Sequence, residues 1–161
     1  MAVRMDDIID RRPMELGDEE FLFLVYASTR AEELAAVPWD AAQKEAFLRM
    51  QFRAQHTHYL SHYPEASYAV LFLAGQPAGR LYLDRRDEEL RILDIALLPE
   101  HRNRGIGTAL IREVMDEAAS AGKPVRLHVE SFNPAYRLYT RLGFTPISDT
   151  GVYTLMEWRP A

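Results

Sequence analysis

The chain has 161 residues, 48% of them hydrophobic and 27% charged, a composition typical of one soluble globular domain with a complete core. With 19 basic and 24 acidic residues its formal net charge is -5, which argues against nucleic-acid binding, because nucleic acids are usually met by a basic surface. The sequence contains no cysteine, which excludes disulfide bonds, thiolate metal sites and a cysteine nucleophile.

The first half of the chain is predicted to form a strand, two helices and a β-hairpin. Asp40 and Gln43 have the spacing of a capping box at the start of the second helix. The pair Gly75-Gln76 is expected to make the tight turn of the hairpin, with glycine first. The expected elements are a strand over 8–14, a helix capped by Asp18 that ends before Pro38, a helix that starts at Asp40, and strands over 67–74 and 77–86.

The second half of the chain alternates strands and helices. Residues 92–98 are nearly all apolar, as expected of a strand that is covered on both faces. Asn133 is placed to cap a later helix, with Pro134 at its first position. The expected elements are a strand over 89–98, a helix after Arg104 that stops at Gly122 and Pro124, a strand over 125–130, a helix that ends at Gly143, and strands over 144–147 and 152–158.

The element order is therefore β-α-α-β-β-β-α-β-α-β-β. It predicts an α/β fold with a central, mixed and twisted sheet of about seven strands, flanked by four helices. The strands over 89–98 and 125–130 and the helix between them form a parallel crossover unit, which is right-handed by the usual rule. Hairpins supply the antiparallel strands of the sheet.

A turn of donors and glycines joins the strand over 89–98 to the next helix. A helix start carries unpaired N–H groups and a partial positive charge, and glycines let a ligand approach the backbone. This turn is thus predicted to hold a phosphate or pyrophosphate, although on the glycines alone a purely architectural turn is an equal alternative. A Rossmann fingerprint fails because Leu110 takes the place of its third glycine, and a P-loop fails because Gly107 is followed by Thr108 rather than lysine.

Two motifs connect the sequence with a known family. The run Arg102-Asn103-Arg104-Gly105-Ile106-Gly107 resembles the R/Q-x-x-G-x-G/A signature of the GNAT-type N-acetyltransferases. About 30 residues later, the segment over 133–144 is similar to their second motif, from an asparagine to Leu-Tyr-x-x-x-Gly-Phe. The element order extends the resemblance to a GNAT-like fold and to a single N-acetyltransferase domain over 1–161, although residues 14–66 match no motif.

The resemblance implies acetyl-CoA as co-substrate, with its pyrophosphate on the glycine turn. Its pantetheine arm is expected to enter a splay between two strands and to pair with the exposed backbone of Ile95 and Leu97. A backbone N–H at Leu97 or a neighbour would then polarise the thioester carbonyl. The implied cofactor-binding residues are Ile95, Leu97, Arg102, Asn103, Arg104, Gly105, Ile106, Gly107, Thr108, Asn133 and Tyr139.

The resemblance also implies that Tyr139 is the general acid that returns a proton to the departing thiolate, whereas its helical spacing is equally that of a core residue. Asp94 interrupts an apolar strand and is a candidate to bind the amine or to drain its proton. Its alternative role is to hold a loop or a nearby arginine. Some members of the family carry a glutamate where this chain has Leu93, so the identity of the general base is not determined by the resemblance. His128 and Glu130 are weaker candidates for this role.

The acceptor pocket is expected between the first two helices and the last strand pair. The candidate substrate-binding residues there, each with an alternative role on the surface or in the core, are Arg30, Trp39, Gln51 and Asp94, with Glu33 and His56 as further lining groups. The five histidines show no spacing typical of metal ligands, so no metal is expected.

These observations predict an acetyl-CoA-dependent N-acetyltransferase in which a small-molecule or peptide amine attacks the thioester directly. The alternatives are a non-catalytic acyl-CoA-binding sensor or scaffold and an enzyme for longer acyl chains.

No run approaches the roughly 18 apolar residues of a membrane span, and no secretory signal is present. We therefore expect a cytoplasmic protein without membrane or nucleic-acid partners. Homodimers are common in this fold type, and the sequence leaves the acceptor, the acyl chain and the oligomeric state open.

Overall fold

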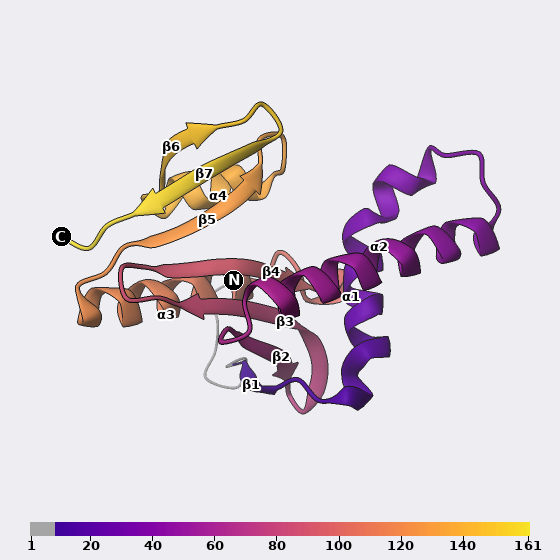
Figure 1. The fold of residues 1–161 in the computed structure, drawn as a ribbon, viewed down its shortest axis with the longest axis horizontal. Coiled ribbons are helices and arrows are strands. Elements are labelled where there is room, and N and C mark those ends of the chain that lie inside the picture. Colours follow the sequence, from indigo (N-terminus) through magenta and orange to yellow (C-terminus); the bar gives the residue numbers. More distant parts are fainter. Residues whose placement is uncertain (1–8) are drawn as a thin grey trace.

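The computed structural model describes residues 9–161 and contains one seven-stranded sheet with helices on both faces (Figure 1). The predicted order of strands and helices is confirmed. Short 3-10 helices, η2 (Leu16–Asp18) and η3 (Pro99–His101), join some of the elements. The main elements are β1 (Asp10–Pro13), α1 (Glu19–Ala35), α2 (Ala41–His62), β2 (Ser67–Leu73), β3 (Gln76–Arg85), β4 (Leu90–Leu97), α3 (Ile106–Ala121), β5 (Val125–Glu130), α4 (Ala135–Arg141), β6 (Thr145–Asp149) and β7 (Tyr153–Trp158).

The local signals for helix starts have mixed outcomes. The capping box of α2 is confirmed in both directions, with the Gln43 N–H donating to the Asp40 carboxylate (2.8 Å) and the Asp40 N–H donating to the Gln43 side chain (3.0 Å). Asp18 is the N-cap residue of α1, as predicted, but its side chain makes no cap hydrogen bond to the helix. Its carboxylate instead accepts from the Glu15 N–H (2.7 Å) and from Arg12.

Two predictions for the β-strands also need correction. The two-residue turn of the β2–β3 hairpin is Ala74-Gly75, both with positive φ, because Leu73 pairs with Gln76 across it. The predicted turn was therefore one residue too late, and Gly75 stands second in it, as in a type I′ turn. The first strand covers only Asp10–Pro13 rather than 8–14, and Ile8 lies outside the described residues.

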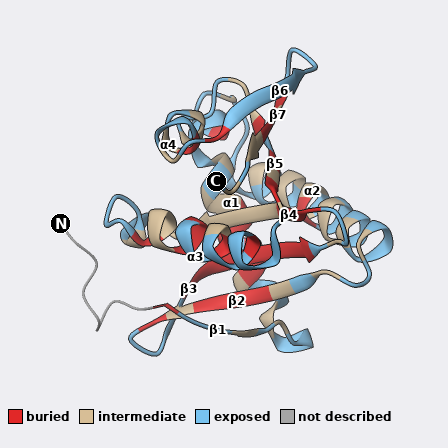
Figure 2. Ribbon diagram, turned by 90° about the vertical axis from the view of Figure 1, so that its left-hand side faces the viewer, coloured by how far each residue is buried: buried red, intermediate tan, exposed pale blue. Residues whose placement is uncertain are grey.

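Alternating residues of the strands bury two separate clusters (Figure 2). Leu71 of β2 belongs to the larger cluster, which packs against α3 and α4, whereas its neighbour Val70 packs against α1 and α2. Successive side chains of a strand point to opposite faces, so α1 and α2 cover one face of the sheet and α3 and α4 cover the other. Among residues 9–161, no helix is long and apolar enough to cross a membrane.

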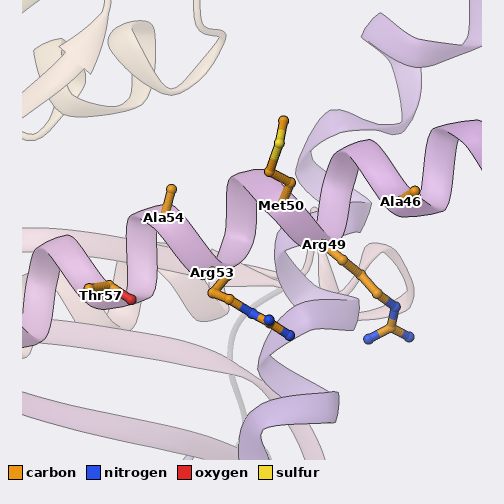
Figure 3. Close-up of a pocket in the computed structure, with 6 residues that line it drawn as sticks. All are labelled: Ala46, Arg49, Met50, Arg53, Ala54 and Thr57. Atoms are coloured by element: carbon orange, nitrogen blue, oxygen red, sulfur yellow. The ribbon is translucent and has the colours of Figure 1, made fainter.

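The outer face of α2 carries a shallow hollow (Figure 3). All of its lining residues come from this one helix, and Arg49 and Arg53 point to one side of it while Met50 and Ala54 point to the other. A ligand site needs walls that converge on the ligand. One helix supplies a single wall, so this hollow carries no argument about function.

The sheet order is β1-β2-β3-β4-β5-β7-β6, and β4 and β5 form its only parallel pair within the described residues. Their pairing covers only Leu90–Ile92 against Val125–Leu127. Beyond these residues β4 stays with β3 and β5 stays with β7, so the sheet splits into two arms (Figure 1). A β-bulge at the branch point leaves Leu93 as an extra residue of β4, and bulges bend a strand in this way.

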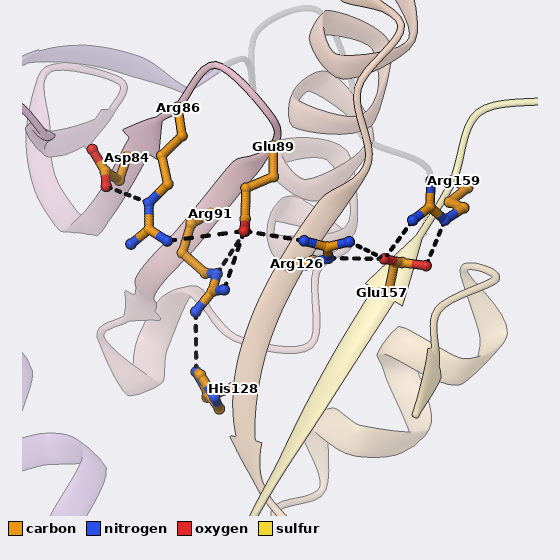
Figure 4. Close-up of polar contacts among 8 residues, drawn as sticks. All are labelled: Asp84, Arg86, Glu89, Arg91, Arg126, His128, Glu157 and Arg159. Carbon is orange, nitrogen blue, oxygen red and sulfur yellow. Dashed lines mark hydrogen bonds and ion pairs between the residues drawn. The ribbon is translucent and has the colours of Figure 1, made fainter. Parts of the chain in front are cut away.

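An ion network joins the strands at the closed end of the split (Figure 4). Arg91 and Arg126 occupy paired positions on β4 and β5, where two like charges would repel each other. Glu89, 6% exposed, accepts hydrogen bonds from both, at 2.8 Å from Arg91 and 3.2 Å from Arg126. Arg126 continues to Glu157 of β7 (2.8 Å), so the network spans three strands. We call the following residues the closed-end network: Asp84, Arg86, Glu89, Arg91, Arg126, Glu157 and Arg159.

Substitution Glu89→Gln is expected to lower the free energy of unfolding at neutral pH by about 1.5–3 kcal/mol, the usual worth of hydrogen bonds to charged groups. Burial alone would raise the pKa of Glu89, but the hydrogen bonds and charges of Arg91 and Arg126 outweigh it and hold that pKa below its usual value. The contribution is therefore complete above the pKa of the unfolded chain and is lost as the pH falls through the lower pKa of the folded protein.

Urea unfolding of both proteins at neutral and acidic pH measures this difference, which should shrink in acid. Glu117→Gln is the matched control, because Glu117 pairs with Arg85 at an exposed site where an ion pair is worth at most about 1 kcal/mol. Equal losses in the two variants would contradict a special role for the closed-end network.

Candidate functional site

The split leaves one edge of β4 without a partner strand. The Leu98 N–H donates to the Ala78 carbonyl at 2.8 Å, and hydrogen-bonding direction alternates along a strand. The N–H groups of Leu97 and Ile95 therefore point away from β3, toward the side that β5 has left. Both residues were predicted to offer their backbone to a ligand, and on this edge they have no partner strand, although they lie opposite Gly79 and Leu81 of β3 on the other edge.

Gly79 of β3 allows the two strands to approach closely at this place. It lies opposite Leu97, and a Cβ atom added to it would stand 2.2 Å from the Ala96 carbonyl oxygen. Any other residue would have to push β4 out of its position. Sequence reasoning missed this residue, although a glycine inside a predicted strand is a known sign of close backbone approach.

The glycine turn ends at the N-terminus of α3. Asn103 (φ 60°) and Gly105 (φ 80°) are both in the left-handed region, which explains a glycine at position 105. Within residues 9–161, no side chain caps α3, so its first N–H groups remain available. Gly107 has ordinary backbone angles, and a Cβ added there would meet nothing within 4 Å, so the space above this turn is open. Such a turn suits an anion.

Arg102 joins this turn to two other parts of the site. Its Nε donates to the Leu97 carbonyl at 2.9 Å, and its Nη2 donates to the Ser28 hydroxyl of α1 at 3.1 Å. The side chain thus lies along the free edge of β4. In this arrangement it satisfies one of the acceptors that the missing strand would have used.

Tyr139 and Asn133 come from α4 and the loop before it. The Tyr139 ring is 7% exposed and packs on Phe144 with 5.7 Å between centroids. Burial, and after it the negative charge of Asp94, raises the pKa of Tyr139, so the phenol stays protonated near neutral pH. The N-cap residue of α4 is Pro134 rather than the predicted Asn133, and the helix begins at Ala135. Asn133 precedes the cap, and its side chain accepts from the Ala135 N–H at 2.9 Å.

Asp94 forms an ion pair with Arg80, a residue of β3 that is 2% exposed. Gln55 of α2 accepts from the same guanidinium at 3.0 Å, and the guanidinium lies 4.9 Å from the centre of the Tyr82 ring. This pair is the structural alternative that the sequence left open for Asp94, a carboxylate held beside an arginine. A catalytic role for Asp94 remains a prediction.

The predicted acceptor-side residues separate into two groups. Arg30 of α1 reaches Glu33 (3.0 Å) and, across the split, Glu130 at the end of β5 (3.4 Å). The others make contacts within the helical pair: Gln51 accepts from Tyr26 (3.2 Å), Trp39 packs on Phe47 (5.2 Å between centroids), and His56 stacks on Phe52 (5.5 Å). In the described part of the chain, no group of three or more acidic or histidine side chains could hold a metal ion.

A cleft of about 150 Å³ lies at the branch point of β4 and β5. It opens on the face of the sheet that α2 covers. Tyr59 of α2 donates to the Leu93 carbonyl at 3.2 Å in its wall. Of its residues, sequence reasoning considered His128 as a weaker candidate base and Leu93 as the place where some family members carry a glutamate, but it did not predict the cleft. The lining residues, which we call the branch-point cleft, are His58, Tyr59, Tyr63, Arg91, Ile92, Leu93 and His128.

Comparisons with known proteins point to one family. Residues 28–144 match the profile of the acetyltransferase (GNAT) family. A comparison with curated proteins finds no match. Among solved structures, the chain is similar to the PaiA N-acetyltransferase of Thermoplasma acidophilum in complex with coenzyme A, with 20% identity and a TM-score of 0.71 over 94% of this chain and 99% of that chain.

Two further structures are similar over nearly their whole length. An acetyltransferase from Thermus thermophilus has 19% identity and a TM-score of 0.69, with 99% of each chain covered. The ribosomal-protein-S18-alanine N-acetyltransferase of Escherichia coli has 20% identity and a TM-score of 0.63, with 96% of this chain and 95% of that chain covered. At these identities the likeness establishes the fold.

Proposed function

Since the chain belongs to the GNAT acetyltransferase family, we propose that it is an acetyl-CoA-dependent N-acetyltransferase that acts on a primary amine. The observation that carries the proposal is the free edge of β4 beside the uncapped N-terminus of α3. This combination suits an extended, amide-bearing chain that ends in a pyrophosphate, which is the shape of coenzyme A. One of the similar structures contains coenzyme A.

Two elements of the fold, α3 and β4, are proposed to bind different parts of the coenzyme. The first N–H groups of α3, at Ile106, Gly107 and Thr108, would hold the pyrophosphate together with the side chains of the turn before them. The open space above Gly107 supports this placement. The backbone of Ile95 and Leu97 would pair with the pantetheine arm, as an added strand does.

When bound, acetyl-CoA supplies the acyl group in activated form, as a thioester. In the proposed reaction the Leu97 N–H polarises the thioester carbonyl, and the free amine attacks its carbon. The new C–N bond forms while the C–S bond breaks, and the proton lost by the amine passes to water or to a carboxylate such as Asp94. The chain offers no suitable nucleophile for a covalent intermediate, so its contributions are orientation, polarisation and proton transfer.

Tyr139 is the proposed donor to the departing sulfur. Its raised pKa keeps it protonated, so the O–H is always available. The same shift makes it a weaker acid than an exposed tyrosine, because a thiol has a pKa of about 8.5 and an ordinary phenol about 10. A hydrogen bond that stabilises the developing thiolate is therefore favoured over complete transfer before the thiol leaves.

A binding module that holds acyl-CoA without turnover is the second candidate. Two observations favour it: Asp94 is engaged by Arg80, and the place where some members of the family carry a glutamate is Leu93. Release of free thiol from acetyl-CoA, measured with the purified protein and a panel of amines, separates the two candidates. Amine-dependent release supports the enzyme, and tight coenzyme binding without any release supports the module.

The substitution Gly107→Glu is expected to abolish coenzyme binding while the protein remains folded. A side chain at this position meets nothing within 4 Å, so the folded structure can accommodate it, but its carboxylate would occupy and charge the space proposed for the pyrophosphate. Gly107→Ala is the matched control, because the family signature accepts alanine at this position and binding should persist. Calorimetry with coenzyme A and thermal unfolding measure binding and stability. Unchanged affinity in Gly107→Glu would remove the pyrophosphate from this turn.

The substitution Tyr139→Phe should lower kcat by about a hundredfold or more, within the usual range for a lost proton donor, while the Kd for acetyl-CoA changes little. Phenylalanine keeps the buried ring and its packing on Phe144, so the folded structure should persist. Steady-state thiol release measures kcat, and calorimetry measures the Kd for acetyl-CoA. Parallel losses in kcat and affinity would assign Tyr139 to packing alone.

A further inference from the structure

The branch-point cleft lies on the opposite face of the sheet from α3. Leu127 and Val129 of β5 belong to the core that packs against α3, so His128 between them faces the side of α1 and α2. His128 is exposed, which makes its ring accessible from the cleft. The glycine turn leads into α3, whereas this cleft is lined by α2. A group bound in the cleft therefore approaches the branch point from the α2 side.

The contacts of His128 fix which of its ring nitrogens carries the proton. The Arg91 guanidinium lies 3.4 Å from Nδ1 (Figure 4). A guanidinium can only donate, so Nδ1 accepts and the neutral ring carries its proton on Nε2. Burial, and then the charge of Arg91, lowers the pKa of His128, against a smaller opposing effect of Glu89. The ring is thus neutral near neutral pH. Its one lone pair, on Nδ1, faces the Arg91 guanidinium and its Nε2–H is a donor, and this arrangement argues against its role as a base.

The charges around the cleft favour an anion. The closed-end network links four arginines with three carboxylates, and Arg91 is the one residue of the network that lines the cleft (Figure 4). Arg91 carries this network into the cleft, and none of the lining residues has a carboxylate. Tyr63 adds a hydroxyl group, and the guanidinium of Arg86 lies 5.5 Å from its ring centre. The volume of about 150 Å³ suits a small group.

A carboxylate stands next to the cleft, on the side away from Arg91. Asp94 follows Leu93 along β4, and its charge contributes, after burial, to the raised pKa of Tyr59 in the cleft wall. The site therefore offers donors and the Arg91 guanidinium at one place and, a short distance along the strand, the carboxylate of Asp94, one oxygen of which is paired with Arg80. This arrangement is complementary to a molecule that carries both a carboxylate and an ammonium group.

We propose that the branch-point cleft binds a carboxylate of the acetyl acceptor, and that the acceptor is therefore an amino acid. The inference rests on the proposed function and narrows its substrate class. His128 donates from Nε2 to the carboxylate, Arg91 contributes its charge, and the amine lies toward Asp94 and the free edge of β4. In this arrangement His128 determines specificity and does not take part in proton transfer.

Thiol release with matched acceptors tests the proposal. The probes are the common amino acids, the corresponding amino acid amides, and the amines that lack the carboxylate. For at least one amino acid, kcat/KM should exceed that of its amide and of its amine by about tenfold or more, the worth of a hydrogen bond to a charged group. The substitution His128→Leu should reduce this ratio at least about tenfold, and His128→Gln, which keeps a side-chain N–H, should restore part of it.

Calorimetry of the same amino acid with the protein saturated by coenzyme A separates this inference from the proposed function. The inference would be overturned, and the function left intact, if the amines were acetylated as efficiently as the corresponding amino acids. The same holds if His128→Leu left the ratio of kcat/KM between amino acid and amine unchanged. Binding of the amino acid to the wild type but not to His128→Leu, without any thiol release, would support the cleft and reject the enzyme. An amino acid that neither binds nor reacts would overturn the inference.

Discussion

The short pairing of β4 with β5 is the constraint on which the rest of the structure depends. Three residue pairs join these parallel strands, and the bulge at Leu93 then separates them. A bare strand edge normally attracts another chain, yet here it is short, lies inside the molecule and is flanked by α3 and α4 on one side. The split thereby leaves an edge that does not pair with another protein chain but offers N–H and C=O groups in fixed directions to a bound ligand.

The closed-end network and the split are two parts of one arrangement. Two arginines at paired positions would push the strands apart, and Glu89 between them reverses that effect at the end where the strands must stay together. The network lies on the α2 face, so it leaves the apolar packing against α3 undisturbed. Arg91 belongs both to this network and to the wall of the branch-point cleft, which connects the integrity of the sheet with the polarity of the cleft.

The sequence was informative wherever a structural rule acts over a few residues. Asp40 and Gln43, the glycine turn before α3 and the apolar run of β4 are such cases, and they were sufficient for the order of elements. Asp18 is the N-cap residue of α1, but it makes no side-chain cap bond because Arg12 and the Glu15 N–H use its carboxylate. The partners of Arg102, Arg30 and Asp94 lie 74, 100 and 14 residues away along the chain. A single sequence carries no periodic pattern for such distant side-chain pairs, so the closed-end network and the branch-point cleft could not be predicted.

The position of Arg102 has a consequence for any measured affinity. Its guanidinium already bonds the Leu97 carbonyl and the Ser28 hydroxyl, so a ligand that donates to this carbonyl from the same direction must first displace it. One hydrogen bond is exchanged for another at that point, and the net gain there is small. Most of the affinity must then come from contacts that displace nothing, above all those between the anionic group of the ligand and the start of α3. Because such charge interactions are screened by ions, salt should weaken the complex markedly.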